Sequence, residues 1–216
     1  LPISVLDGIA LQMIGDLGTA LAADKQKTLR MDLLTRETEN LPSAQRRQLG
    51  LHFVPEERLG RGAVPRMSLA LNTLLTRSEP IERGWWINRS RLRSLAQGLI
   101  KRYDVRTGGP DSLAQSLSGG NKQKVVIARE LAANPTLLIA SQPTRGVDVG
   151  SIEFIHNQIV AARDAGAGVL LVSAELDEIL SLADRIVVVH AGHVVAEMAA
   201  AGADRQLIGR LMAGGN

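Results

Sequence analysis

The stretch LSGGNKQKVVIARELAANPTLLIA, residues 117–140, carries the clearest structural signal in this sequence. Its segment Lys122–Asn134 has apolar residues at helical spacing, so we expect a helix with Val126 and Leu131 on its buried side. Thr136–Ala140 is a short and fully apolar run. Such runs are typical of strands in parallel sheets that are covered on both faces. The stretch therefore predicts a helix followed at once by a buried strand.

The residues that follow alternate between helical and strand patterns. We expect helices over Ser151–Ala165, Leu176–Ala183 and Asp204–Met212. We expect strands over Val169–Val172 and Ile186–Val189, and a hairpin turn at Ala191-Gly192. Strands that alternate with helices of this length indicate βαβ units with right-handed crossovers. The sequence thus predicts an α/β fold with a parallel sheet flanked by helices.

Three parts of the chain differ in character, and we expect them to correspond to residues 1–59, 60–117 and 118–216. The middle part has few β-branched runs and several Leu-rich helical segments, with breaks at Pro65, Pro80 and Gly108-Gly109-Pro110. It is interpreted as an α-helical subdomain. The first thirty or so residues show mixed periodicity and no sharp motif.

Composition excludes some function classes. The chain has 216 residues, enough for a core without disulfides, and it has no cysteine, which excludes cysteine-ligated metals and thiol redox chemistry. Its 25 basic and 22 acidic residues give a net charge of only +3, which disfavours nucleic-acid binding. The densest basic run, Arg89–Arg93, is expected to be a solvated helix face.

No apolar run approaches the ~20 residues that span a bilayer, so a soluble chain is expected. Its first residue is Leu, which suggests a piece of a longer protein.

A small-residue motif stands before the helix of the opening stretch. Ser118, Gly119 and Gly120 precede a helix that we expect to open near Asn121. Exposed backbone N–H groups at a helix N-terminus attract anions, and glycines let the backbone approach a phosphate closely. In many proteins, however, Ser-Gly-Gly before a helix is only a turn and a cap, so the motif alone leaves both interpretations open.

The wider context of this motif resembles the ATP-binding cassette (ABC) family. LSGGNKQK, a helix, a proline, an apolar strand and then PTRGVD are similar to the family's signature, Walker B strand and D-loop. LGLHFVPEERLGRGAVPRMSLALNTLL, residues 49–75, resembles the Q-loop region of sugar and nucleoside importer cassettes, particularly their second cassette. The resemblance runs from about Leu41 to the C-terminus. It implies a P-loop NTPase-like core with an α-helical subdomain, residues 1–59 being the N-terminal, atypical part of that core.

The sequence departs from the family where the family does its chemistry. The Walker B strand of the family ends in Asp and Glu, and the corresponding positions are Ser141 and Gln142. The switch histidine corresponds to Ala174, and the Q-loop glutamine to Glu56. A Walker A loop, GxxxxGK followed by Ser or Thr, does not occur, since the Lys27-Thr28 pair lacks the glycines. Glutamine cannot accept a proton. The resemblance therefore implies a degenerate site without its own metal ligands, and an isolated chain that hydrolyses ATP slowly or not at all.

The resemblance also implies a role in trans. In the family two cassettes pack head to tail, and the signature of each completes the ATP–Mg²⁺ site of the other. The signature positions here are Ser118, Gly119, Gly120 and Asn121, and the D-loop positions at the dimer seam are Arg145, Gly146 and Asp148. The implied partners are a second cassette, membrane permease subunits and, indirectly, a substrate-binding protein. The implied location is the cytoplasmic face of the cell membrane, and the implied cargo is a sugar or nucleoside.

Two other functions compete with this one. The chain could be a regulatory cassette that binds nucleotide or the permease without turnover. A cassette acting on nucleic acid or ribosomes is disfavoured by the weak charge asymmetry and by the importer-like segment Leu51–Leu75.

Single residues also have plainer interpretations. Asp148 could be a turn residue, and Glu56, Glu57 and Arg58 could form a solvated ion cluster worth little energy. The adjacent tryptophans Trp85 and Trp86 could contact a membrane subunit, but ordinary packing is favoured. The histidines His156, His190 and His193 share no metal-ligand spacing, and we expect them on the surface or on strands.

Overall fold

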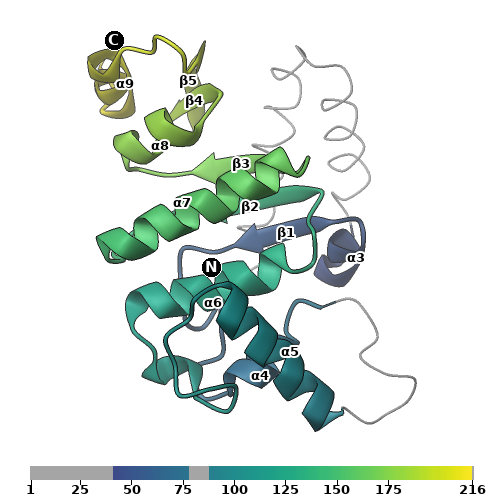
Figure 1. The fold of residues 1–216 in the computed structure, drawn as a ribbon. Coiled ribbons are helices and arrows are strands. Elements are labelled where there is room, and N and C mark those ends of the chain that lie inside the picture. Colours follow the sequence, from purple (N-terminus) through teal and green to yellow (C-terminus); the bar gives the residue numbers. More distant parts are fainter. Residues whose placement is uncertain (1–40, 78–87, 216) are drawn as a thin grey trace.

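The computed structural model describes residues 41–77 and 88–215. The expectations for residues 1–40, including the Lys27-Thr28 pair, and for Pro80, Trp85 and Trp86 lie outside the described residues. Figure 1 shows a parallel sheet crossed by two helices, with further helices on one side of it and a hairpin with two short helices on the other. No helix in the part of the chain described is both long and apolar enough to cross a membrane.

The sheet is three-stranded and parallel, and its order is β1 (Leu51–Val54), β2 (Leu137–Ser141), β3 (Gly168–Val172). The central strand β2 is buried at every residue except the last. The two strands expected near residues 136–140 and 169–172 are therefore confirmed to within one residue at each end. Because the strands are parallel, their carboxyl ends share one edge of the sheet.

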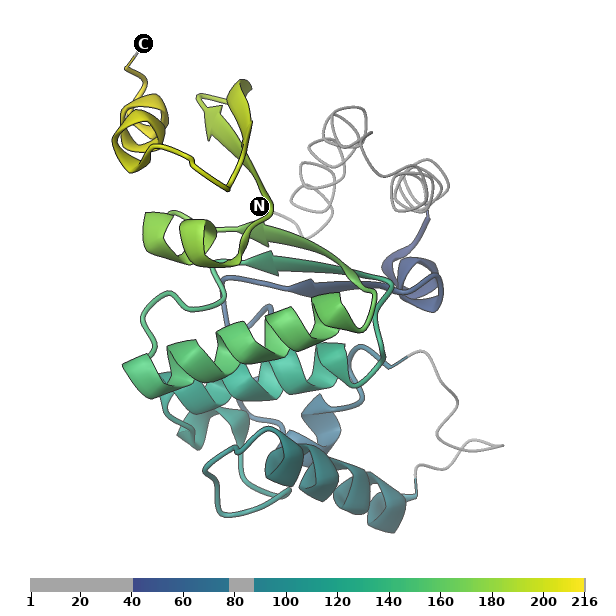
Figure 2. The same cartoon turned by 45° about the horizontal axis from the view of Figure 1, so that its top comes forward.

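Two helices, α6 (Gly119–Leu131) and α7 (Val149–Asp164), lie side by side across one face of the sheet (Figure 2). The expected start of α6 near Asn121 is wrong, because Ser118 caps the helix and both glycines lie inside it. Val126 and Leu131 are buried as expected. Burial extends nearly all round α6, since the sheet, α7 and α5 all contact it.

Residues 60–117 contain α4 (Leu69–Asn72), α5 (Arg89–Arg102) and the short 3-10 helix η1 (Ala114–Ser116), and none of their described residues joins either sheet. The helical character is confirmed, but only α5 is long. The Leu-rich segment makes a single turn because buried Asn72 bonds to the loop before it, donating to the carbonyls of Val64 and Met67. The arginines of Arg89–Arg93 are exposed on α5, as expected.

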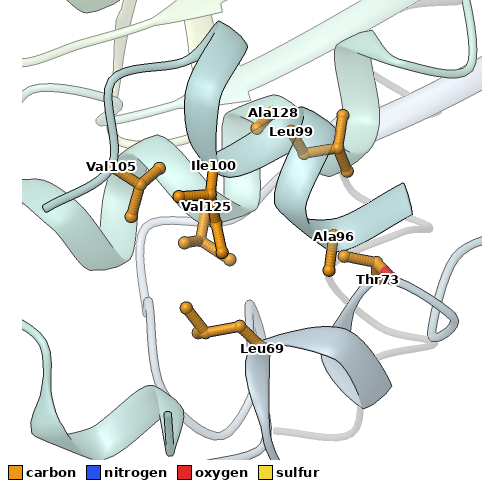
Figure 3. A pocket seen from close by; sticks show the side chains of 8 residues that line it. All are labelled: Leu69, Thr73, Ala96, Leu99, Ile100, Val105, Val125 and Ala128. Atoms are coloured by element: carbon orange, nitrogen blue, oxygen red, sulfur yellow. The ribbon is translucent and has the colours of Figure 1, made fainter. Parts of the chain in front are cut away.

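The joint between α4, α5 and α6 is filled by apolar side chains. Figure 3 shows them converging from the three helices and from Val105. The space left between them is only about 10 Å³ and its lining is almost wholly apolar. A cavity of that size holds at most one water molecule and stays dry when apolar. This joint is therefore packing that fixes α6 and not a ligand site.

The C-terminal part forms a separate small core. It contains α8 (Leu176–Leu182), β4 (Arg185–His190), β5 (His193–Ala199) and α9 (Arg205–Met212). The strands pair antiparallel through the turn Ala191-Gly192, where both residues have positive φ, so the expected hairpin is confirmed. Ile186, Val188 and Ile208 are buried together at its centre. A further short helix, α3 (Ser43–Gln48), precedes β1.

Candidate functional site

The carboxyl ends of β2 and β3 bring the Walker B-like and switch positions together. Ser141 ends β2, and Gln142 follows with a positive φ of 49°. The backbone N–H of Gln142 donates to the carbonyl of Val172, at 2.7 Å. Its side-chain Oε1 accepts the N–H of Ala174, at 3.3 Å. The edge of the sheet where the resemblance predicts two carboxylates thus holds a hydroxyl and an amide.

These residues do not fit a Mg²⁺ ion. Magnesium in nucleotide sites is held by carboxylates and phosphate oxygens. Within residues 41–77 and 88–215, no three His, Asp or Glu side chains gather where a metal could bind. The amide oxygen of Gln142 is engaged with Ala174. The described part of the chain therefore offers no metal centre at this edge.

The loop from Gln142 to Asp148 leads from β2 into α7. Asp148 caps that helix: its Oδ1 accepts the backbone N–H of Ser151 at 2.9 Å, and its Oδ2 accepts the Ser151 hydroxyl at 2.8 Å. These hydrogen bonds lower the pKa of Asp148 below its usual value of 3.8. Asp148 is thus an ionised helix cap, which agrees with the plainer interpretation of this residue.

The signature positions form the first turn of α6. The Ser118 hydroxyl oxygen accepts two hydrogen bonds from Asn121, one from its backbone N–H at 3.4 Å and one from its side-chain amide at 2.8 Å. Ser118 is exposed, Gly119 is half-buried and Gly120 is buried. Asn121 is held in turn through its Oδ1, which accepts the N–H of Arg106 at 2.7 Å. The helix therefore opens with a capped turn whose outer side, at Ser118 and Gly119, is accessible.

Close contacts at the two glycines place this turn beside the D-loop. A Cβ atom at Gly120 would lie 2.4 Å from the Ser151 hydroxyl oxygen and 2.6 Å from Asp148 Oδ2. A Cβ atom at Gly119 would lie 3.5 Å from the carbonyl oxygen of Gly146. The signature and D-loop positions, separated in sequence, thus lie on one surface.

Arg58 connects these two motifs, and the sequence interpretation missed it. Its Nε donates to Gln123 Oε1 at 3.2 Å, and its Nη1 approaches the carbonyl oxygen of Gly146 at 3.5 Å. The same Nη1 lies 3.4 Å from the position of a Cβ atom at Gly119. Burial lowers the pKa of Arg58 below its usual value, but a guanidinium remains charged.

The acidic neighbours of Arg58 pair with other arginines. Glu56 forms an ion pair with Arg145, and Glu57 pairs with Arg61 at 3.3 Å. Among the described carboxylates, none pairs with Arg58. The expected ion cluster of residues 56–58 therefore includes the two glutamates but not the arginine, which turns toward the glycines. Its direction depends on tertiary packing, so no sequence signal pointed to it.

Glu178 on α8 lies behind the D-loop. Its Oε1 accepts the Thr144 hydroxyl at 2.8 Å and lies 3.0 Å from Nε2 of His156. His156 is therefore a partly buried helix residue with a carboxylate partner, and not only a surface residue. His190 and His193 face each other at the end of the hairpin, on strands as expected.

Glu130 on α6 lies at the centre of a second buried polar cluster. It bonds to His52 at 2.9 Å, to Arg129 at 2.8 Å and to the Thr76 hydroxyl at 2.9 Å. Burial alone would raise the pKa of Glu130, but its hydrogen bonds from His52, Arg129 and Thr76 and the charge of Arg129 outweigh burial and lower it. This cluster joins β1, α6 and the chain after α4, so its role is to hold the site's elements together.

A second hollow, lined by both polar and apolar residues, lies away from these motifs. Its volume is about 310 Å³, and it is lined by residues before β2, such as Pro135 and Thr136, and by the end of α7. This is the amino end of the sheet, opposite Ser141 and Gln142. It contains none of the residues expected to act on nucleotide.

Comparison with family models gives no match. Curated proteins do match. The chain is 46% identical to the nucleoside import ATP-binding protein NupA of Lactococcus lactis, over 76% of this chain and 33% of that protein. It is 40% identical to the guanosine import ATP-binding protein NupO of Bacillus subtilis, over 83% of this chain and 36% of that protein. It is 37% identical to the ribose import ATP-binding protein RbsA of Geobacillus kaustophilus, over 77% of this chain and 34% of that protein. The chain thus spans about a third of the length of these relatives.

Solved structures agree on the fold. The dimeric post-hydrolysis state of the ATP-binding cassette MJ0796 bound to ADP and Pi matches with a TM-score of 0.61 at 24% identity, over 76% of this chain and 69% of that chain. A nucleotide-free cassette from an ABC transporter matches with a TM-score of 0.59 at 22% identity, over 75% of this chain and 66% of that chain. At this identity the likeness shows the fold alone.

Proposed function

The chain belongs to the ATP-binding cassette transporter ATPases, among relatives that are import ATP-binding proteins for sugars and nucleosides, and from this premise we propose that it completes a partner cassette's ATP site with its signature motif. The observation that carries the proposal is the accessible first turn of α6 at Ser118 and Gly119, with the D-loop beside it. An open helix N-terminus of this kind binds phosphate through its N–H groups and dipole.

The charge near this turn supports the same role. Arg58 brings a guanidinium within 3.4 Å of where a Cβ atom at Gly119 would be, and no described carboxylate pairs with it. A cation without a counter-ion next to a helix N-terminus favours an anionic ligand. The triphosphate of ATP bound to the facing cassette would supply that anion, with its Mg²⁺ held by the partner's carboxylates.

The site on this chain's own strands is proposed to be degenerate. Ser141 and Gln142 provide no carboxylate to hold a metal or to take a proton from water, and Ala174 provides no imidazole. Gln142 can still orient a water molecule. In the proposed assembly, the composite site that holds this chain's signature turns over, and the site at Ser141 and Gln142 does not.

The wider assembly is proposed from the relatives. Their names describe import of nucleosides, guanosine and ribose, so the proposed cargo is a sugar or nucleoside. The proposed partners are a second cassette, in the same polypeptide or a separate one, permease subunits and an extracytoplasmic binding protein that acts through them. The chain would then lie at the cytoplasmic face of the membrane, without contacting nucleic acid.

The test adds a cassette with intact Walker A and Walker B motifs and compares Gly119→Asp with Gly119→Asn. We expect the partner to restore ATP hydrolysis, Gly119→Asp to lower that rate by about 100-fold through repulsion of phosphate, and Gly119→Asn to lower it much less. The two substitutions have the same size, so the difference between them reports charge. A carboxylate at a helix N-terminus beside Arg58 should not destabilise the fold, which thermal unfolding checks.

Equal rates for the wild type and both variants would contradict the proposed role in trans. Tight binding of ATP to the isolated chain, with no effect of the partner on turnover, would favour the regulatory cassette instead.

A further inference from the structure

Glu178 is a buried carboxylate for which the proposed function has no use. It lies on α8, and only 4% of its surface is exposed. One oxygen, Oε1, receives the hydrogen bonds of Thr144 and His156, while Oε2 is buried with no hydrogen-bond partner among the described residues. Burying a carboxylate that is only half satisfied is costly. Its position therefore calls for a reason beyond packing.

The partner Thr144 lies in the middle of the D-loop. Pro143 and Thr144 are buried, whereas Arg145 and Gly146, which follow, are exposed. Thr144 also accepts the N–H of Val147 on its carbonyl oxygen, at 3.2 Å, which closes the turn. The loop thus presents its exposed residues from a single buried anchor, and the side-chain contact of that anchor is Glu178.

Two further contacts make this anchor part of a larger connection. Gln142 is bonded to Ala174 at the strand ends, so the loops after β2 and β3 are tied there as well as through Thr144 and Glu178. His156, about two turns into α7, brings that helix to the same carboxylate. Glu178 therefore joins three elements: the D-loop, α7 and α8.

The backbone of the loop shows why an anchor matters. Gln142 and Gly146 both adopt positive φ, 49° and 63°. A non-glycine residue in this region is unfavourable and persists only when its surroundings hold it. The bonds of the Gln142 and Thr144 side chains hold this stretch from the side of β3 and α8, while Arg145 pairs with Glu56 and Arg58 contacts the carbonyl of Gly146.

We propose that Glu178 is a positioning residue that fixes the D-loop, through Thr144, in the shape it presents to a partner cassette. This inference rests on the proposed function, because the D-loop has a task only at the seam with that partner. Glu178 touches neither nucleotide nor the reacting atoms. It acts on Arg145, Gly146 and Asp148 by holding the turn from which they project.

The test removes the hydroxyl without changing the size of the side chain. Thr144→Val loses the bond to Glu178, and Thr144→Ser keeps it. With the partner cassette present, we expect Thr144→Val to lower kcat for ATP hydrolysis about 10-fold with little change in KM, and Thr144→Ser to stay within about 3-fold of wild type. In the double variant Thr144→Val/Glu178→Ala, the loss should not exceed that of the larger single change, because both changes remove the same bond between Thr144 and Glu178. Glu153→Ala, at an exposed glutamate on α7, is the matched control for truncating a glutamate.

A second measurement on the isolated chain separates positioning from simple stability. Hydrogen exchange of the amides of residues 145–148 should become at least about 10-fold faster in Thr144→Val and stay unchanged in Thr144→Ser, while exchange in β2 is unchanged in both. Equal exchange at residues 145–148 in the two variants would overturn the proposal. The proposal would also be overturned if the loss of kcat in Thr144→Val were fully accounted for by the fraction of the variant that is unfolded. Because exchange needs no partner, and Gly119→Asp is assayed in parallel, failure of this inference is distinguishable from failure of the proposed role in trans.

Discussion

At the scale of single residues, the two glycines of the signature turn have different surroundings. A methyl group at Gly120 fits only if Ser151 and Asp148 move, since their oxygens lie 2.4 and 2.6 Å from its position. Moving them breaks the cap of α7. At Gly119 the nearest atoms lie 3.4 and 3.5 Å away, which is ordinary contact. The close approach of α6 to α7 therefore requires glycine at one position and not at the other.

This difference gives a stability prediction. Gly120→Ala should lower the free energy of unfolding by about 1–3 kcal/mol, through overpacking and loss of the helix cap. Gly119→Ala should change it by less than about 1 kcal/mol, because alanine is favoured in helices and meets no clash. Urea unfolding of the two variants measures both values. Equal destabilisation by the two substitutions would mean that the helices do not approach each other as the structure has them.

The sequence predicted the positions of the site better than their contacts. Ser118, Gln142 and Asp148 could be located because motifs fix the order of residues along the chain. Arg58 could not, because the direction of its side chain depends on the glycines of a helix sixty residues later. The buried partner of Thr144 was missed for the same reason: a glutamate on a short amphipathic helix reads as solvent-facing until the fold brings the D-loop to it.

At the scale of elements, Glu130 connects parts that are far apart in sequence. His52 lies on β1, Arg129 and Glu130 on α6, and Thr76 follows α4. Both Glu130 and Arg129 are nearly fully buried. Removing the negative charge leaves the Arg129 guanidinium buried without its counter-ion, which is costly. The placement of α6, and with it the signature turn, depends on this cluster.

A pH-dependent stability follows, and its sign can be worked out. The pKa of Glu130 is lowered from 4.5 in the folded chain, so folding favours the ionised form. Its contribution is complete above the unfolded pKa and is lost as pH falls through the lower folded pKa. Glu130→Gln should cost about 3 kcal/mol at neutral pH, and its difference from wild type should shrink below about pH 4. Chemical denaturation at a series of pH values measures both effects.

The surface pair of Asp177 and Arg205 is the comparison for that experiment. The Arg205 hydrogen bond lowers the pKa of Asp177 too, but this pair is exposed. High salt should therefore weaken any effect of Asp177→Asn and leave that of Glu130→Gln largely intact. A salt-sensitive effect at Glu130 would show that the cluster is open to solvent.

The helices and strands were predictable where periodicity is long. The strands near residues 136–140 and 169–172, the helix α7 and the hairpin all follow from pattern and turn residues. The start of α6 was misplaced because glycine disfavours helix in general, whereas here the Ser118 cap and the contact with α7 extend the helix over both glycines. The shortness of α4 also escaped prediction, because it results from the side-chain bonds of Asn72 to the preceding loop.

At the scale of the whole molecule, the described chain has two main cores, and we expect them to differ in their protection from hydrogen exchange. One surrounds α6 and the parallel sheet, and the other lies between α8, β4, β5 and α9. The central strand β2 has a neighbour on each side, whereas β5 pairs with β4 alone in the part of the chain that the structure describes. The motifs of the proposed site lie with the first core. We therefore expect the hairpin to open without disturbing the signature turn.

Hydrogen exchange under native conditions tests this division. Amides open locally with free energies that range from near zero in exposed segments up to the global value in core strands. Most residues of β5 are exposed and those of β2 are buried. We therefore expect the amides of His193–Ala199 in β5 to exchange at least about 100-fold faster than those of Leu137–Ser141 in β2. Gly120→Ala should make exchange in β2 faster and leave exchange in β5 unchanged. Equal protection in the two strands, or a common response to that substitution, would instead mean that both cores unfold as one cooperative unit, and the hairpin could then not move independently of the signature turn.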